Sequence, residues 1–140
     1  MPGPTGIRRQ LSFVESMSDE CPFQIMRVYW LHNLGAGDER GFHAHKELQQ
    51  VLVAVAGSVD VELDDGRNKV TYGLNNASKG LYLPAGLWRT LTINTNALSE
   101  STVMVLASLH YDEADYIRHY PDYLTYVGES PWGTALHPSV

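Results

Sequence analysis

Short apolar stretches separated by turn residues run through most of this chain. Between residues 59 and 63, apolar residues alternate with acidic ones, which is typical of a strand buried on one face. The run from Val51 to Ala56 is continuously apolar and also favours a strand. The predicted strands cover residues 7–15, 23–34, 48–56, 59–63, 69–74, 80–83, 89–93 and 101–109. Because they are short and nearly evenly spaced, they predict an all-β sandwich or barrel.

The pattern changes after residue 109. The acidic residues Asp112, Glu113 and Asp115 precede Arg118, an order that the dipole of a helix favours. We therefore expect a helical segment over residues 110–127, interrupted at Pro121. The chain of 140 residues fits a single domain. Its expected parts are an N-terminal arm (1–24), a β-barrel (25–109), the helical segment (110–127) and a tail (128–140).

Composition and charge narrow the class of protein. Hydrophobic residues make up 44% and charged residues 19%, as in ordinary globular domains, and no apolar run approaches the roughly 20 residues of a membrane span. No signal-peptide pattern opens the chain, and Cys21 is its single cysteine, so no intrachain disulfide can form. These features predict a cytoplasmic protein. The net charge of −6 argues against nucleic-acid binding, so an anionic ligand would need a local cluster of arginines.

Two histidines, His43 and His45, stand just before the long apolar strand. Side chains two residues apart on a strand point to the same face, so we expect both imidazoles to converge. With Gly37 before them, and Gln50 and Gly57 after them, the spacing resembles the first signature of the cupin superfamily. That signature has a glutamate where this chain has Gln50, so one expected metal ligand is missing.

The second cupin signature is recognisable in the step from Pro84 to Gly86. Arg89 stands where that signature has a histidine ligand, and a protonated guanidinium offers no lone pair to a metal. We therefore predict a cupin pocket that uses no metal and keeps two histidines for proton transfer. The alternative is a metal-dependent cupin enzyme, in which His43 and His45 bind the ion together with water or another carboxylate.

A narrower resemblance, to the dTDP-sugar 3,4-ketoisomerases, covers about residues 27–126. The matching segments are residues 27–29, 40–46, 50–52, 57–58, 63–66, 79–82, 105–108 and 111–118. The resemblance implies a cupin double-stranded β-helix without metal or organic cofactor. It also implies a homodimer whose N-terminal strands pair across subunits. The implied reaction converts dTDP-4-keto-6-deoxyglucose to a 3-keto sugar through an enediol.

Imidazoles can carry such a reaction, because they accept and return protons near neutral pH. We expect His45 to be the carbon base and His43 its partner, with the exchanged assignment left open. The developing enediolate needs hydrogen-bond donors, which Arg89, Gln50 or Tyr29 would supply.

The nucleotide part of the implied substrate calls for other residue types. Arg27 and Arg40 are expected to bind the pyrophosphate, because the planar guanidinium pairs with two phosphate oxygens, unless they form surface ion pairs instead. For thymine, the candidates are Trp88, Tyr82 and Tyr29. Trp88 and Tyr29 are also the right size to fill the core.

Two arginines give conflicting indications of the product's configuration at carbon 4. Arg89 favours the gluco product, whereas Arg8 resembles the branch that makes the galacto product, and we expect the gluco product. Two further functions stay open. One is a non-catalytic module that binds a dTDP-sugar. The other is a 3,5-epimerase on the same fold, against which the second histidine argues.

Overall fold

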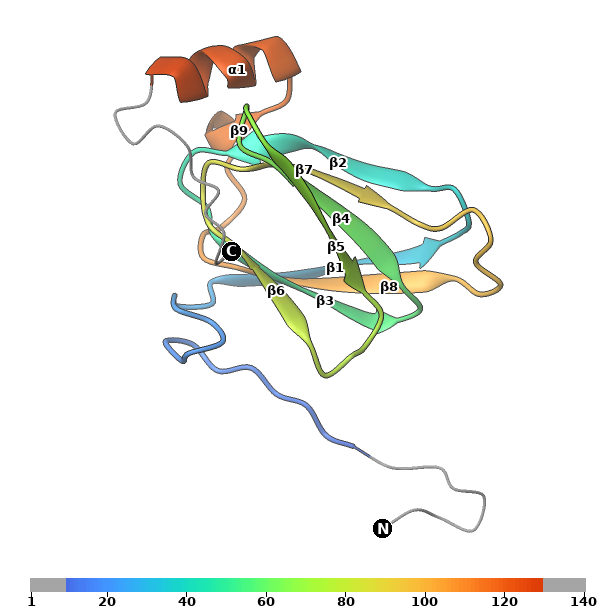
Figure 1. The fold of residues 1–140 in the computed structure, drawn as a ribbon. Coiled ribbons are helices and arrows are strands. Elements are labelled where there is room, and N and C mark those ends of the chain that lie inside the picture. The colour runs from blue at the N-terminus through green and yellow to red at the C-terminus, as the bar shows by residue number, and fades with distance from the viewer. Residues whose placement is uncertain (1–9, 130–140) are drawn as a thin grey trace, which may run out of the picture.

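Two antiparallel β-sheets, packed face to face, form the body of the protein (Figure 1). The computed structural model describes residues 10–129, and within them the sheets have the strand orders β1-β8-β3-β6 and β5-β4-β7-β2-β9. The strands are β1 (Arg27–Leu34), β2 (Glu39–His45), β3 (Gln50–Ala56), β4 (Val59–Asp64), β5 (Lys69–Leu74), β6 (Gly80–Leu83), β7 (Trp88–Thr92), β8 (Ser101–Ala107) and β9 (Tyr116–Ile117). The predicted all-β cupin architecture is confirmed.

The main core lies between the two sheets and follows the alternation in the sequence. In β4, Val59, Val61 and Leu63 are buried in this core, while Asp60 on the opposite face is exposed. The same core includes Leu52 of β3, from the other sheet. Apolar contact between the inner faces therefore joins the sheets, as in other sandwiches.

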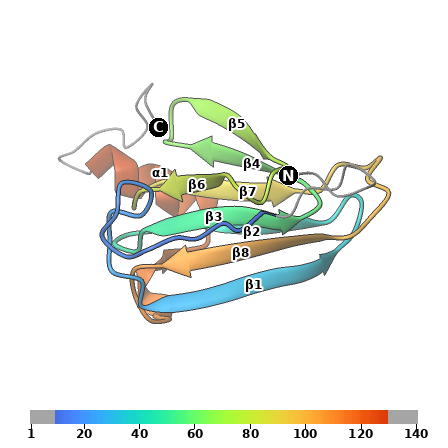
Figure 2. The same ribbon diagram turned by 90° about the horizontal axis from the view of Figure 1, so that it is seen from below.

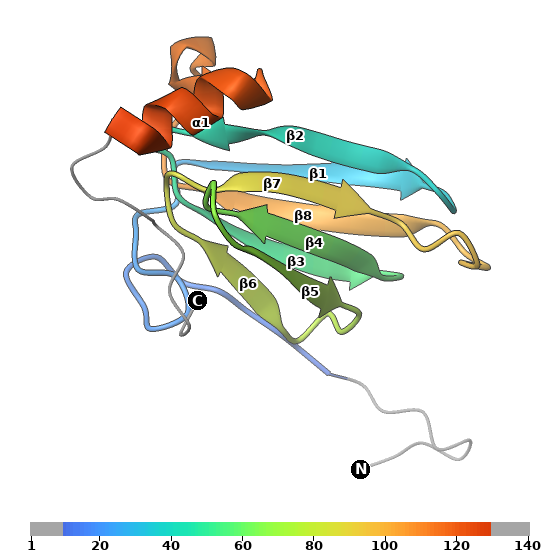
Figure 3. The ribbon, with the colours of Figure 1, turned by 45° about the horizontal axis from the view of Figure 1, so that its top comes forward.

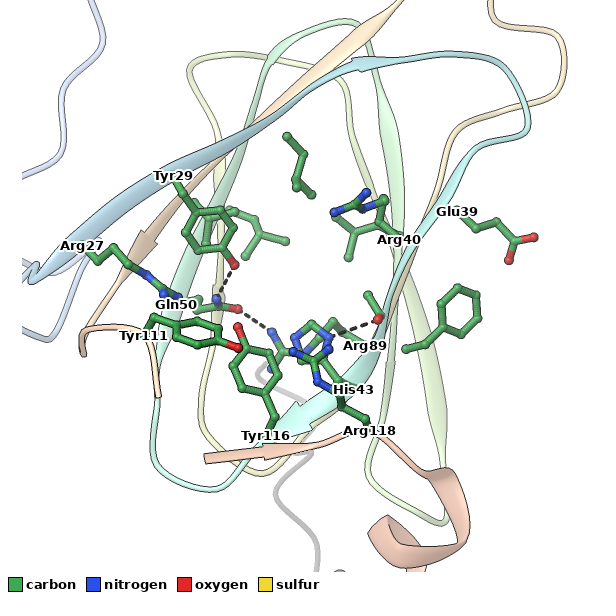
Figure 4. Close-up of a pocket in the computed structure, with 16 residues that line it drawn as sticks. Arg27, Tyr29, Glu39, Arg40, His43, Gln50, Arg89, Tyr111, Tyr116 and Arg118 are labelled. Carbon is green, nitrogen blue, oxygen red and sulfur yellow. Dashed lines mark hydrogen bonds between the residues drawn. The ribbon is translucent and has the colours of Figure 1, made fainter. Parts of the chain in front are cut away.

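The strand register carries polar residues into this interior at one end of the barrel. Arg27 of β1 pairs with Ala107 of β8, and Ala107 in turn pairs with Gln50 of β3, so the three residues share one row across the sheet. Tyr29 lies two residues after Arg27 and therefore faces the same side. Arg27, Tyr29 and Gln50 thus point inward toward β2 and β7 (Figure 4).

A β-bulge in β2 controls which of its side chains face the interior. Gly41 pairs with Thr90 and His43 with Arg89, so Phe42 is an extra residue without a partner on β7. Gly41 and Phe42 both have left-handed backbone angles, with φ of 95° and 58°. A Cβ atom at residue 41 would lie 2.8 Å from the backbone oxygen of Arg89, which explains the glycine.

The outer face of the β1-β8-β3-β6 sheet is apolar as well. Trp30, Met104 and Val53 are register partners that point outward from adjacent strands. The N-terminal segment (residues 10–23) crosses this face beneath β3 (Figure 2), and its Phe23 packs against Val53. The segment leaves Trp30 60% exposed.

Two predicted elements differ in the structure. Residues 10–15 of the expected strand 7–15 are not in a strand, and residues 7–9 lie outside the described residues. The expected helical segment is a 3-10 helix (Glu113–Asp115), then β9, and only then helix α1 (Tyr120–Glu129). Pro121 does not interrupt α1 but occupies its first turn, where a missing N–H costs nothing.

Helix α1 covers one end of the barrel beside β2 (Figure 3). Tyr123 is fully buried, and its hydroxyl lies 2.7 Å from the backbone oxygen of Gly86. The Tyr120 hydroxyl donates to a carboxylate oxygen of Asp64 at 2.6 Å. In the part of the chain that the structure describes, no helix is long and apolar enough to cross a membrane.

Candidate active site

A cavity of about 590 Å³ opens between the two sheets near β2 and β9 (Figure 4). Polar and charged side chains from both sheets surround it, together with a few apolar residues. The lining residues are Arg27, Tyr29, Leu31, Glu39, Arg40, Gly41, Phe42, His43, Gln50, Leu52, Arg89, Leu91, Val105, Tyr111, Tyr116 and Arg118.

The two histidines meet at this cavity, as predicted from their spacing. Their ring centroids lie 4.8 Å apart, with the rings nearly perpendicular. His43 lines the cavity, whereas His45 is fully buried one layer behind it. The ring of Tyr116 lies against both, with centroid distances of 4.9 Å to His43 and 4.3 Å to His45. Tyr116 therefore borders the path from the cavity to His45.

Each imidazole is anchored through its Nδ1 atom. His43 Nδ1 lies 3.1 Å from the backbone oxygen of Gly41, which can only accept, so Nδ1 carries the proton and Nε2 a lone pair. His45 Nδ1 lies 3.1 Å from Oδ2 of Asp115. The Nε2 atoms of both histidines are buried without a hydrogen-bond partner among residues 10–129. Such unpaired buried polar atoms are uncommon in folded proteins and are typical of functional sites.

Burial keeps both imidazoles uncharged. Burial, together with the nearby charge of Arg89, lowers the pKa of His43 to about 4. Burial and then Arg89 also move the pKa of His45 far below its usual value. At neutral pH both rings are therefore neutral and able to accept a proton.

A chain of hydrogen bonds connects Arg89 to Tyr29 across the cavity floor. The buried Arg89 donates from Nη1 to Oε1 of Gln50, and Gln50 donates from Nε2 to the Tyr29 hydroxyl oxygen at 2.9 Å. An arginine can only donate, so it fixes which end of the amide faces Tyr29. The hydroxyl of Tyr29 accepts from Gln50 and keeps its own proton available for a ligand.

Positive charge gathers around the cavity despite the net negative charge of the chain. Arg27, Arg40, Arg89 and Arg118 line it, and Glu39 is the one acidic residue among the described residues that do so. Burial lowers the pKa of Arg89 only to about 10, so its charge persists at neutral pH. The site can therefore attract an anionic ligand.

Arg27 stands between aromatic rings at one wall of this cavity. Its guanidinium carbon lies 4.8 Å from the ring centroid of Tyr29 and 5.7 Å from that of Tyr111. Its Nε atom is buried without a hydrogen-bond partner among the described residues. A cationic donor packed near two rings is suited to bind phosphate oxygens.

Seven of the nine predicted site residues come together here. His43, Arg27, Tyr29, Arg40, Gln50 and Arg89 line the cavity, and His45 lies directly behind it. Two residues do not belong to the group. Tyr82 points to the outer face of its sheet, where it packs near Phe23 and its hydroxyl donates to Gln49 at 2.7 Å. Trp88 packs instead against Tyr120 and Tyr123 beneath α1.

The sequence interpretation missed the contribution of residues 111–118. Strand β9 pairs with the end of β2, Ala44 opposite Ile117 and His45 opposite Tyr116, and this pairing brings Tyr116 and Arg118 to the cavity. The segment was recognisable as part of the matching motif, but its charge order suggested a helix. Within residues 10–129, no cluster of three or more His, Cys, Asp or Glu side chains is arranged to hold a metal ion.

The fold and the polar cavity define a cupin-type enzyme site, and comparison with known proteins identifies the family. Residues 1–128 match the family model described as FdtA, WxcM-like, C-terminal. The TDP-4-oxo-6-deoxy-α-D-glucose 3,4-oxoisomerase of Aneurinibacillus thermoaerophilus is 42% identical over 108 residues, which are 77% of this chain and 76% of that protein. The chain belongs to this family of sugar 3,4-ketoisomerases, which confirms the resemblance, and it is an enzyme of the intramolecular isomerase type.

Solved structures of 3,4-ketoisomerases agree with this family assignment. The 3,4-ketoisomerase QdtA of Thermoanaerobacterium thermosaccharolyticum, in complex with TDP, is 38% identical with a TM-score of 0.76, over 83% of this chain and 82% of that one. A mutant of QdtA has been solved with TDP-4-keto-6-deoxyglucose. WlaRB of Campylobacter jejuni, a TDP-quinovose 3,4-ketoisomerase, is 40% identical with a TM-score of 0.73, over 81% of this chain and 84% of that one.

Proposed function

We propose that this chain converts TDP-4-keto-6-deoxyglucose to TDP-3-keto-6-deoxyglucose in deoxysugar biosynthesis, by proton transfer through an enediol. The observation that carries the proposal is the pair of neutral histidines, each with an unpaired Nε2 atom, beside a cavity lined by arginines. Relatives bind the corresponding ligands: QdtA binds TDP, and its mutant binds the 4-keto sugar.

In the proposed reaction His45 removes the proton on carbon 3, this proton exchanges with solvent, and a proton from solvent is delivered to carbon 4. The hydroxyl on carbon 3 loses its proton as that carbon becomes the ketone, and the oxygen on carbon 4 gains one, so the reaction needs no external oxidant. His43 is placed to move the proton between the oxygens. Because a base must approach to about 3–3.5 Å, the Tyr116 ring that borders His45 has to shift when the sugar binds.

The developing negative charge on the sugar oxygens needs donors. We assign this role to Tyr29, because its hydroxyl proton is free while Gln50 and the charge of Arg89 polarise it from behind. The amide at position 50 suits this chain of bonds better than a carboxylate would. A carboxylate could accept from Arg89 but has no hydrogen to donate to Tyr29.

The nucleotide is proposed to bind through the arginines. Arg27 and Arg40 line the cavity and would hold the pyrophosphate, whereas Arg118 at the rim is already paired with Glu113. Since Trp88 and Tyr82 lie elsewhere, the aromatic rings that remain at the cavity for thymine are those of Tyr29, Phe42, Tyr111 and Tyr116.

The proposed gluco product depends on Arg89. Arg89 of β7 is the register partner of His43 on β2 and lies at the floor of the cavity. From there it can influence the face from which carbon 4 is protonated. Support comes from the 40% identity to WlaRB, which is named for quinovose, the 6-deoxy sugar of gluco configuration. Arg8, which resembles the galacto branch, lies outside the described residues.

Replacing Arg89 by histidine is expected to change the product ratio toward the galacto sugar. The smaller ring removes the donor to Gln50 and opens the floor on one face of the enediol. Proton NMR coupling constants at carbon 4 give the ratio. Arg67→His, on the exposed turn between β4 and β5, is the matched control. An unchanged ratio would remove Arg89 from the stereochemical argument.

We also propose a homodimer formed through the outer face of the β1-β8-β3-β6 sheet. Trp30 is 60% exposed there, and the N-terminal segment presents Leu11 and Phe13 with 84% and 75% of their surfaces exposed. Such a concentration of exposed apolar side chains is typical of an interface. The expected pairing of N-terminal strands across subunits would continue this contact.

Trp30→Glu is therefore expected to convert the dimer to monomer, because it buries a charge in the proposed apolar contact. Light scattering coupled to size exclusion measures the mass. The control is Arg67→Glu, on the exposed turn between β4 and β5 of the other sheet. A monomeric wild-type protein, or a dimeric Trp30→Glu variant, would contradict the proposed interface.

The experiment that tests the function is proton NMR of TDP-4-keto-6-deoxyglucose with the protein in deuterium oxide. We expect a 3-keto product carrying deuterium at carbon 4. Exchange at carbon 5 instead would indicate an epimerase, and binding without exchange would indicate a non-catalytic module. Loss of activity on chelation, with stoichiometric metal in the untreated protein, would favour the metal-dependent alternative. A cytoplasmic location stays a prediction.

A further inference from the structure

A buried carboxylate, Asp115, lies behind the two histidines. It ends the 3-10 helix Glu113–Asp115, just before β9, and is 8% exposed. Its Oδ2 atom lies 3.1 Å from Nδ1 of His45. The two residues are far apart in sequence, and the pairing of β9 with β2 brings them together.

Backbone N–H groups of the turn after His45 also bind this carboxylate. Its Oδ1 atom accepts from the backbone N–H of Glu47 at 2.8 Å, and Oδ2 accepts from that of Leu48 at 3.2 Å. The backbone oxygen of Asp115 accepts from the N–H of Lys46 at 3.0 Å. Three hydrogen bonds, two to the carboxylate and one to the backbone oxygen, thus fix Asp115 relative to the turn that follows His45.

This arrangement determines which nitrogen of His45 carries the proton. A carboxylate accepts hydrogen bonds, so the proton of the neutral ring belongs on Nδ1, and Nε2 is left with its lone pair. No other partner competes, because Nε2 has none among residues 10–129. When Nε2 takes up a proton, the ring becomes positive, and the adjacent carboxylate stabilises that charge.

We propose that Asp115 is a positioning residue for the reaction: it holds His45 in the tautomer with a free Nε2 and stabilises the imidazolium that forms. The proposal rests on the proposed function for its statement about rate, since that requires His45 to be the carbon base. The tautomer itself is a property of the resting protein and can be measured without substrate.

The first measurement is the tautomer, by nitrogen-15 NMR of histidine-labelled wild-type protein. The signals of His45 are assigned by their absence from the His45→Asn variant. We expect a protonated Nδ1 and an unprotonated Nε2. A proton on Nε2 in the wild-type protein would overturn the proposal, whatever the enzyme's activity.

The second measurement is the rate for Asp115→Asn. Asparagine keeps the shape and one acceptor for the turn at residues 47–48 but removes the charge. We expect kcat to fall at least about 100-fold, with the Kd for TDP within about two-fold of wild type. A fall in TDP affinity with unchanged kcat, or wild-type values of both, would overturn the positioning role.

Asp112→Asn is the matched control in the same segment. Asp112 caps the 3-10 helix by accepting from the N–H of Ala114 at 3.0 Å, and asparagine is an equally good cap. It should retain the wild-type rate and the wild-type tautomer. If the wild-type protein catalyses no isomerisation, the proposed function fails, and the tautomer still decides separately whether Asp115 orients His45.

Discussion

Replacing His45 by asparagine is expected to reduce turnover of TDP-4-keto-6-deoxyglucose by at least about 1000-fold, within the range that general base catalysis contributes. The amide of asparagine reaches the position of Nδ1 in the imidazole, so it can keep the hydrogen bond to Asp115. It has no atom at the position of Nε2. The change therefore removes the base and leaves the cavity wall almost unaltered, because His45 itself does not line the cavity.

Two measurements and a control variant make this result specific. Deuterium exchange at carbon 3 should disappear together with turnover, while the Kd for TDP stays within about two-fold of wild type. The control is His119→Asn, whose imidazole is largely exposed and lies 3.4 Å from Asp122. Retention of exchange in His45→Asn, together with its loss in His43→Asn, would reverse the two proposed roles. Wild-type rates for both variants would refute the proton-transfer site.

The sequence was most informative where neighbouring residues decide the structure. Alternation in β4 and the apolar run of β3 predict strands because burial of a sheet face depends on side-chain period alone. The spacing of His43 and His45 predicts their convergence for the same reason. Arg40 shares their face only because Phe42 forms a bulge, and no simple alternation reveals that extra residue.

The parts of the site that the sequence did not reveal depend on contacts between distant segments. Asp115 meets His45 across 70 residues, through a strand of only two residues whose surroundings look helical. Trp88 stands next to Arg89 in β7 and therefore faces the other side of the sheet, toward α1. Composition made it a reasonable ring for thymine, but the strand period places it in the core.

A large loss of nucleotide affinity is expected when Arg27 is replaced. Arg27→Gln should weaken TDP binding by about 10- to 150-fold, equivalent to the 1.5–3 kcal/mol typical of hydrogen bonds to a charged group. The guanidinium lies over the rings of Tyr29 and Tyr111, and its Nε has no partner among the described residues, so a phosphate oxygen would complete its hydrogen bonding. Glutamine removes the charge and the planar fork but keeps much of the side-chain volume.

Isothermal titration with TDP and with thymidine separates the phosphate contact from the base contact. The variant should lose affinity for TDP but not for thymidine, and the remaining TDP affinity should depend less on salt concentration. Lys79→Gln removes an exposed positive charge outside the cavity and is the matched control. Equal losses for TDP and thymidine would place Arg27 against the base, and unchanged TDP affinity would place the pyrophosphate nearer Arg40 and Arg118. The ratio of the two losses therefore gives the orientation of the nucleotide in the cavity.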